Sequence, residues 1–157
     1  RDLEFIEAAK KFNIDRFLFS FVEFEDDIVL FNDALKEIKD AKKILKIESQ
    51  NGLNLVRKMT KLPKDIGLMA ARDDLVVHVG NIEAMKGVVD IARKDRDAIC
   101  ASRLLMGLET GGEVTLADVA DIDLAYLFKC RHFMLSDGIS QRHFKKAIDF
   151  WTEYNKA

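Results

Sequence analysis

The sequence has little proline, little cysteine and no long apolar run. No segment approaches the roughly 20 consecutive apolar residues of a membrane helix, and the first residues lack the apolar core of a signal peptide. Pro63 is the single proline, and the two cysteines, Cys100 and Cys130, lie in different segments without metal-ligand spacing. We interpret these cysteines as reduced, partly buried thiols. The absences predict a soluble, cytoplasmic protein without a membrane segment.

An excess of charge of either sign is also missing. The chain has 25 basic and 27 acidic residues, which give a formal net charge of −2. Such a balance provides no electrostatic reason to expect binding to nucleic acid or to an anionic membrane. Hydrophobic residues make up 48% of the chain and charged residues 33%, which is typical of a globular protein. We therefore treat residues 1–157 as a single domain with its own core.

Helical and strand-like patterns alternate along the chain. Short apolar runs of the kind buried on both faces of a parallel sheet predict five strands. These expected strands cover residues 16–22, 43–48, 65–71, 97–101 and 132–135. The helices expected between and around them cover residues 2–12, 26–39, 50–61, 81–94 and 140–156. A further helix should begin near Thr115, where a hydroxyl is followed three residues later by an acid, as in a capping box.

This alternation predicts an α/β fold with a parallel sheet and right-handed crossovers. A complete (β/α)₈ TIM barrel takes about 250 residues, so the chain holds roughly five of eight units. On the residues alone, an open doubly wound sheet and a partial barrel both stay open. The apolar edge strands at residues 17–22 and 132–135 would lack partners, which favours a homo-oligomer or a longer polypeptide. A chain that begins with Arg1 rather than methionine agrees with the second of these.

Charged residues gather where two adjacent strands are expected to end. In parallel α/β folds the active site lies at the carboxyl ends of the strands. The second expected strand ends with Lys46 and Glu48 on one face, and the third is followed by Arg72, Asp73 and Asp74. Glu48 and Asp74 suit Mg²⁺, and a lysine beside the ion could stabilise an enolate or a phosphoryl group. A network of ion pairs, Lys46 with Glu48 and Arg72 with Asp74, is an equal alternative.

Several segments match, in order, the segments of one known enzyme family. Residues 44–52, ILKIESQNG, resemble the motif KIEN-x-x-G, and residues 67–75, GLMAARDDL, resemble GIMVARGDLG. Further matching segments lie in the same order and at comparable spacing, at residues 2–4, 18–22, 98–105, 118–120 and 133–136. Over nearly its whole length the chain therefore resembles the barrel domain of the pyruvate kinase family, from the fourth strand to the eighth.

The resemblance implies a role for each matching residue. Lys46 would stabilise the enolate and the phosphoryl transition state, and Glu48 and Asp74 would bind the divalent ion, Mg²⁺ or Mn²⁺. Arg72 matches the arginine of the ARGD turn, and Ser102 falls where the family has a threonine near the methyl group of the enolate. These residues would bind phosphoenolpyruvate or a related 2-oxo acid, with K⁺ and ADP or ATP as further candidates.

The residues around this lysine and these carboxylates depart from the family pattern. Asp73 replaces the glycine of ARGD, whose amide helps to hold the substrate carboxylate. The Asp73 side chain would repel that anion or recruit a different ligand. Glu23 replaces the arginine of SFVR, and Arg103 replaces the glutamine after the threonine. Such changes around unchanged metal-binding carboxylates, Glu48 and Asp74, agree with a changed substrate or a lost activity.

Three functions follow as hypotheses. The first is a transferase, a pyruvate-kinase-like enzyme of Mg²⁺-dependent phosphoryl transfer that uses phosphoenolpyruvate or the enolate of pyruvate. The second is a metal-dependent lyase or aldolase that acts on a pyruvate-type 2-oxo acid without a nucleotide. The third is a catalytically inactive scaffold domain, which the Asp73 substitution favours.

Overall fold

The computed structural model describes residues 2–156 and contains the five expected strands. These strands are β1 (Arg16–Phe19), β2 (Lys42–Ile47), β3 (Ile66–Ala71), β4 (Ile99–Ala101) and β5 (His132–Met134). All neighbouring strands are parallel, and they follow one another in sequence order across the sheet. The α/β prediction is therefore confirmed. A doubly wound sheet reverses its strand order at a switch point, whereas this order is that of a partial β/α barrel.

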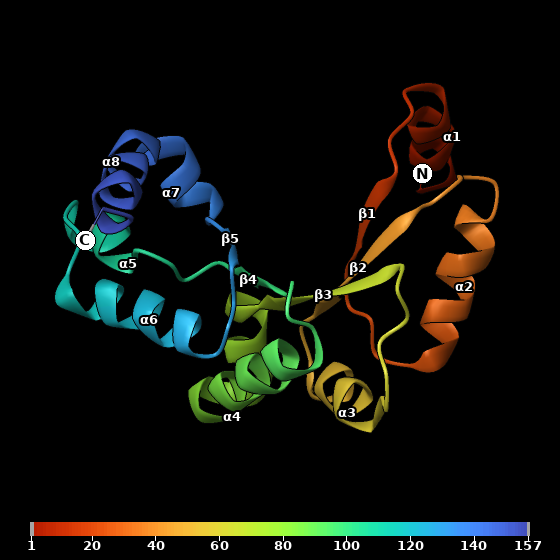
Figure 1. Ribbon diagram of the computed structural model, residues 1–157, viewed down its shortest axis with the longest axis horizontal. Coiled ribbons are helices and arrows are strands. Elements are labelled where there is room, and N and C mark those ends of the chain that lie inside the picture. The colour runs from red at the N-terminus through yellow and green to blue at the C-terminus, as the bar shows by residue number, and fades with distance from the viewer. Residues whose placement is uncertain (1, 157) are drawn as a thin grey trace.

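Eight helices connect and flank these strands within residues 2–156. They are α1 (Asp2–Lys11), α2 (Glu25–Leu35), α3 (Gln50–Lys58), α4 (Arg72–Lys94), α5 (Met106–Gly111), α6 (Leu116–Leu127), α7 (Asp137–Arg142) and α8 (Phe144–Tyr154). Figure 1 shows α2, α3, α4 and α6 along the outer side of the curved sheet, while its inner side is open. The arrangement is that of a barrel wall with its covering helices.

The helices differ from the prediction in three places. Helix α4 begins at Arg72, nine positions before the expected start, and is broken at Gly80, whose φ of 76° favours glycine. The short helix α5 was not predicted. The last helix is two helices, α7 and α8, which His143 separates. The capping box is confirmed, because the Thr115 and Asp118 side chains accept each other's backbone N–H groups.

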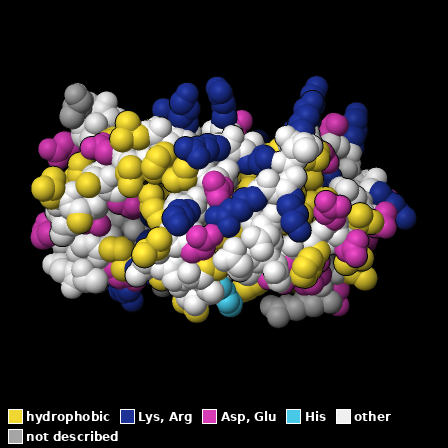
Figure 2. Space-filling view, turned by 90° about the horizontal axis from the view of Figure 1, so that it is seen from below, with side chains coloured by type: hydrophobic (Ala, Val, Ile, Leu, Met, Phe, Trp, Pro, Cys, Tyr) yellow, Lys and Arg dark blue, Asp and Glu magenta, His cyan; other side chains and the backbone are white. Residues whose placement is uncertain are grey.

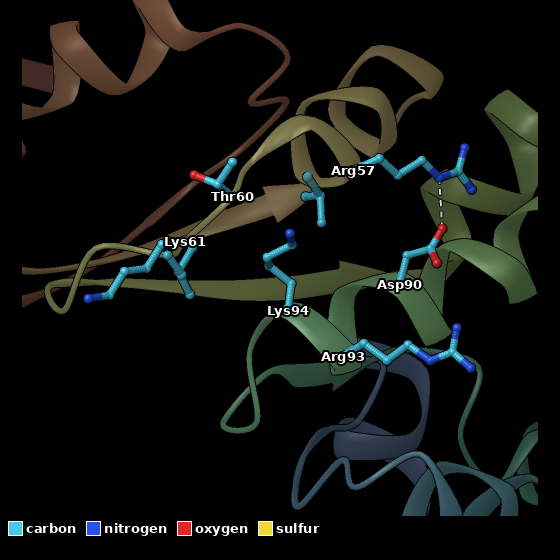
Figure 3. Close-up of a pocket in the computed structure, with 8 residues that line it drawn as sticks. Arg57, Thr60, Lys61, Asp90, Arg93 and Lys94 are labelled. Carbon is cyan, nitrogen blue, oxygen red and sulfur yellow. Dashed lines mark hydrogen bonds and ion pairs between the residues drawn. The ribbon is translucent and has the colours of Figure 1, made fainter.

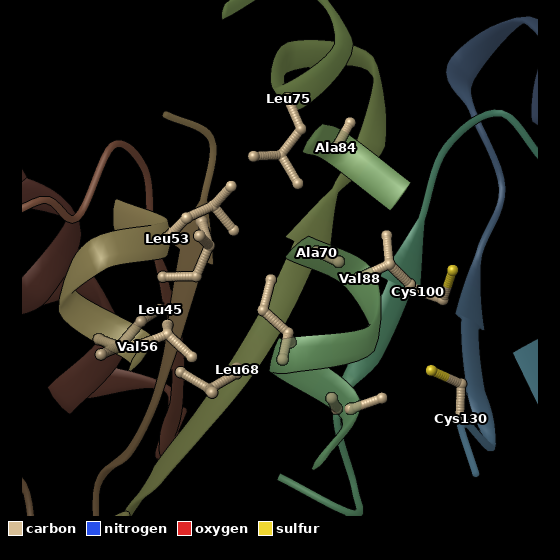
Figure 4. Close-up of a cluster of buried hydrophobic side chains, with 14 of the residues drawn as sticks. Leu45, Leu53, Val56, Leu68, Ala70, Leu75, Ala84, Val88, Cys100 and Cys130 are labelled. Atoms are coloured by element: carbon tan, nitrogen blue, oxygen red, sulfur yellow. The ribbon is translucent and has the colours of Figure 1, made fainter. Parts of the chain in front are cut away.

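The main core lies between the outer face of the sheet and helices α3 and α4 (Figure 4). Leu45 and Ile47 of β2 and Leu53 of α3 are completely buried, and Leu68 of β3 is 1% exposed. Helices α3 and α4 approach closely where α4 carries Gly87. A Cβ atom at Gly87 would lie 2.5 Å from a methyl carbon of Leu53, so any larger residue would displace this buried side chain. This packing holds the central strands in place.

A second apolar cluster joins β5 to helices α5 to α8. Its buried members are Leu104, Leu105, Leu108, Ile122, Ile139 and Ala147. The rings of Phe133, on β5, and Trp151, on α8, meet edge to face with centroids 5.4 Å apart. This cluster fixes the C-terminal helices against the end of the sheet.

The two edge strands are less covered than the central ones. Among the described residues, β1 pairs only with β2, and β5 only with β4. Leu18 on β1 is 47% exposed, and Met134 on β5 is 41% exposed. Both line one hollow of about 540 Å³, together with Met69 of β3. The unpartnered edges agree with the sequence prediction. Within residues 2–156, no helix is both long enough and apolar enough to span a membrane.

Candidate active site

The site begins at the carboxyl end of β2, where Lys46 and Glu48 lie on one face. Lys46 Nζ lies 2.8 Å from Glu48 Oε1 and 3.3 Å from Ser20 Oγ. The Glu48 side chain is 2% exposed, and its second oxygen accepts the backbone N–H of Phe21. A buried carboxylate needs such partners, because the loss of water would otherwise cost several kcal/mol. The ion pair proposed between Lys46 and Glu48 is therefore confirmed.

The segment after β1 completes this arrangement. Phe21 has a left-handed φ of 52°, which costs roughly 1–2 kcal/mol and directs its N–H towards Glu48. A charge-assisted hydrogen bond offsets a cost of that size. The Phe21 ring is 48% exposed and meets the His78 ring edge to face. Ser20 and Phe21 were not among the candidate residues, because the first strand was expected to continue to residue 22, whereas β1 ends at Phe19.

The next strand, β3, leads directly into α4, so Arg72, Asp73 and Asp74 form the first turn of this helix. Acidic side chains there complement the partial positive charge of a helix amino terminus. Ile47 pairs in register with Ala70, so Glu48 and Asp74 follow neighbouring strands at the same edge of the sheet. Asp74 is partly buried and Asp73 is exposed. Asp74 therefore lies at the same end of the sheet as Lys46 and Glu48.

Arg72 is turned towards the far side of the site. It is 7% exposed, and its Nη1 lies 2.8 and 2.9 Å from the two carboxylate oxygens of Asp121 on α6. Its Nε and Nη2 donate to the backbone carbonyl of Ser102, at 3.0 and 2.6 Å. The proposed ion pair of Arg72 with Asp74 is therefore wrong. Asp121 was not predicted, because it lies 49 residues after Arg72 in the sequence, on α6, and no local pattern connects the two residues.

The turn after β4 brings Ser102 to Asp73. Ser102 and Arg103 both have left-handed backbone angles, with φ of 58° and 52°. The Ser102 hydroxyl accepts the backbone N–H of Asp73 at 3.1 Å and donates to the Ala101 carbonyl at 2.7 Å. Arg103 Nη1 lies 3.4 Å from Asp73 Oδ1. Two of the departures from the family pattern, Asp73 and Arg103, thus neutralise each other.

The two cysteines lie beneath this region. Cys100 is 0% exposed and Cys130 is 3% exposed, so both free thiols are buried more deeply than expected. Figure 4 shows the two side chains on the same side of the core, Cys100 on β4 and Cys130 before β5. The hydrogen bond with Cys130 and burial together raise the pKa of Cys100. A thiol of this kind is a weak nucleophile, so Cys100 is part of the core rather than of the chemistry.

The carboxylates can be compared with the needs of a metal ion. Within residues 2–156, no group of three or more His, Cys, Asp or Glu side chains could hold an ion by itself. Mg²⁺ does not require such a cage, because it keeps several water molecules and often binds through one or two carboxylates. Each Glu48 oxygen accepts one hydrogen bond and retains a lone pair. Glu48 and Asp74 therefore have the donor chemistry of a Mg²⁺ site that water or substrate completes.

Comparisons with known proteins identify distant relatives. No model of a known protein family matches the chain. It is 28% identical over 141 residues to pyruvate kinase 1 of Saccharomyces cerevisiae, and 30% identical over 142 residues to pyruvate kinase of Borreliella burgdorferi. Pyruvate kinase 2 of Candida glabrata is 27% identical over 141 residues. Each match covers 87% of this chain but only 27–29% of the relative. The chain is thus a distant relative of the pyruvate kinases and spans less than a third of their length.

Proposed function

We propose that this chain provides the metal- and enolate-binding side of a pyruvate-kinase-like barrel. The reaction would be Mg²⁺-dependent phosphoryl transfer with phosphoenolpyruvate or the enolate of pyruvate, and ADP or ATP as the second reactant. The observation that carries the proposal is the contact of Lys46 with the buried Glu48, beside β3, which leads into the helical turn that contains Asp74. The similarity to pyruvate kinases over 87% of the chain supports it.

Glu48 and Asp74 would hold Mg²⁺ or Mn²⁺, and K⁺ belongs to the proposal as a second cation. The divalent ion would neutralise negative charge that develops on enolate and phosphoryl oxygens. Lys46 is fixed by Glu48 and Ser20 at a partly open position, where its ammonium can donate to the same oxygens. Donors that are already oriented stabilise developing charge without reorganisation.

The neighbouring residues would shape the substrate pocket. Arg72 holds the Ser102 carbonyl and Asp121, so it positions the turn in which the Ser102 hydroxyl lies. That hydroxyl would border the methyl group of the enolate. The Asp73 carboxylate would repel a substrate carboxylate, and its ion pair with Arg103 offsets part of this repulsion. We therefore expect Arg72, Asp73 and Ser102 to influence substrate binding mainly by fixing the shape of the turn after β4.

Exchange of the pyruvate methyl protons with D₂O tests the proposal, because enolate formation releases a methyl proton to the solvent and reprotonation returns a deuteron. With Mg²⁺ we expect the chain to accelerate this exchange, followed by proton NMR. Lys46→Met should slow it at least tenfold, since the enolate loses a fixed cation. Lys42→Met is the matched control, because Lys42 is an exposed lysine at the other end of β2.

The absence of exchange by a folded, Mg²⁺-binding chain would reject the enolate chemistry. Condensation of pyruvate with an aldehyde, without any turnover of ADP, would instead favour a lyase or aldolase.

A second candidate is a non-catalytic scaffold. Specific observations favour it: Asp73 is paired with Arg103, and Glu23 accepts a hydrogen bond from Ser49. These substituted side chains therefore have partners within the fold and add no free positive charge to that of Lys46 for an anionic substrate. On this hypothesis Lys46→Ala would leave the biological function intact, which a complementation assay can measure.

We also propose that the edges of the sheet associate with another copy of the chain. Leu18 and Met134 leave apolar surface exposed on β1 and β5, and unpaired edges invite strand addition. Sedimentation velocity at tens of micromolar should show dimers or larger species. A single monomeric boundary over that range would contradict this proposal.

A further inference from the structure

A second hollow lies at the opposite, amino-terminal end of the sheet. Its volume is about 550 Å³, and it lies between the last turns of α3 and α4 and the segment that leads into β3 (Figure 3). Helix α3 ends where the chain turns towards β3, and α4 ends where it turns towards β4. The hollow is therefore remote from Lys46, Glu48 and Asp74, which lie at the carboxyl ends of the strands.

The charged lining of this hollow is strongly one-sided. Arg57, Lys61, Arg93 and Lys94 line it, against a single carboxylate, Asp90. The chain as a whole carries a net charge of −2, so this excess of cations is local. Figure 2 shows lysine and arginine side chains gathered on the face seen from below Figure 1, with a few acidic side chains between them. Concentrated charge of one sign in a hollow raises the local concentration of the opposite ion.

Two of the four cations have partners within the fold. Arg57 donates to Asp90 and to Glu83, each at 2.7 Å, and these carboxylates raise its pKa. Lys94 donates to the backbone carbonyl of Met59, at the end of α3. A cation at a helix carboxyl terminus also complements the partial negative charge there. These contacts fix Arg57 and Lys94 in place.

The other two cations, Lys61 and Arg93, are not explained by the fold. Both are exposed, and no ion pair joins either to a carboxylate within residues 2–156. In Figure 3, Arg57 and Arg93 extend in the same direction on either side of Asp90. Lys61 extends the opposite way in this view, and its flexible four-carbon side chain can turn towards an anion in the hollow. A bound anion would neutralise the excess of positive charge along the lining.

We propose that this hollow binds a small molecule that carries two or more phosphate groups. Guanidinium groups match phosphate oxygens with pairs of hydrogen bonds, and lysines add point charges. The volume lies within the range of about 300–1,000 Å³ of small-ligand sites, and Val56 and Leu62 give it an apolar side. The proposal does not depend on the reaction at the other end of the sheet.

Isothermal titration of the 157-residue chain with inorganic tripolyphosphate tests the site. We expect saturable binding of one equivalent, and at least a tenfold weaker affinity for the double variant Lys61→Gln/Arg93→Gln. The control removes two other exposed charges far from the hollow, with Lys11→Gln/Lys145→Gln, and should change the affinity less than twofold. Thermal unfolding of both variants shows whether they are folded.

The variant Asp90→Asn should gain affinity for tripolyphosphate, and a loss of folding could not produce such a gain. Removal of the single carboxylate in the lining should tighten tripolyphosphate binding severalfold. The proposal is overturned if the unmodified chain shows no saturable binding, if both double variants lose affinity equally, or if Asp90→Asn weakens binding.

Discussion

The central strands and the edge strands of this sheet are built differently. On β3, five of six residues are buried, and β2 and β4 cover both of its edges. On β1, exposed residues alternate with partly buried ones, and Leu18 faces the open inner side. The candidate site draws on both regions, because Glu48 lies next to the buried centre and accepts a hydrogen bond from Phe21, after the edge strand. The buried central strands therefore hold the candidate site in place, and the partly exposed segment after β1 leaves one side of the site accessible.

The largest expected effect concerns the core itself. Leu68→Ala on β3 should lower the free energy of unfolding by about 2–5 kcal/mol, because it leaves a cavity in the closed centre. Leu18→Ala on β1 should cost less than about 1 kcal/mol, because this side chain is already half exposed. Urea unfolding of both variants measures the difference. Equal losses would mean that the edge is covered in solution, by association for example.

The arginines beside the site provide the second comparison. Arg72→Gln should cost about 2–4 kcal/mol, because it leaves the Asp121 carboxylate and the Ser102 carbonyl without their partner. Arg103→Gln should cost about 0–1 kcal/mol, since its ion pair with Asp73 is exposed on both sides. Urea unfolding again measures both values. A large loss for Arg103→Gln would assign it a structural role that its contacts do not suggest.

The smallest effect is a dependence of stability on pH. The hydrogen bond from Lys43 lowers the pKa of Asp65, so this pair stabilises the fold above the ordinary carboxyl pKa of about 4. The stabilisation should disappear as the pH falls through the lowered pKa of Asp65. Because the Asp65 side chain is 48% exposed, we expect less than about 1 kcal/mol. Lys43→Met should remove this increment, so the stabilities of variant and parent should begin to converge as the pH falls below about 4 and should meet below the lowered pKa of Asp65.

The peripheral ion pair between Lys10 of α1 and Glu37, in the turn after α2, is the control for that measurement. The hydrogen bond from Lys10 likewise lowers the pKa of Glu37, but this pair is more exposed, with 28% and 67% of its side chains accessible against 9% and 48% for Lys43 and Asp65. Salt at 0.5 M should therefore abolish the pH effect of Lys10→Met while that of Lys43→Met persists. The reverse order would contradict the contrast between centre and edge.

Sequence patterns predict the strands of this protein better than its helix ends. Five short apolar runs became five strands because buried parallel strands need continuous apolar residues. The first turns of α4 were missed because Arg72, Asp73 and Asp74 have no apolar period, and their helical state depends on the helix dipole. Helix α5 was missed because six residues with Gly107 and Gly111 carry no helical pattern.

Neighbouring residues of the site could be predicted from the sequence, but contacts between residues far apart in the sequence could not. Alternation along one strand was enough to place Lys46 beside Glu48. Nothing in the local pattern connects Arg72 with Asp121, because that contact depends on how α6 returns to the sheet. The left-handed turn at Ser102 and Arg103 is likewise a result of tertiary packing, since neither residue type favours it.

Divalent-ion binding tests the central claim most directly, namely that Glu48 and Asp74 form a metal site beside Lys46. Titration with Mn²⁺, with the free ion followed by electron paramagnetic resonance, should show one saturable site. Asp74→Asn should weaken it at least tenfold, whereas Asp73→Asn, the same change one position earlier in the same helical turn, should change it less than threefold. Absence of a saturable site, or equal losses in the two variants, would contradict the account.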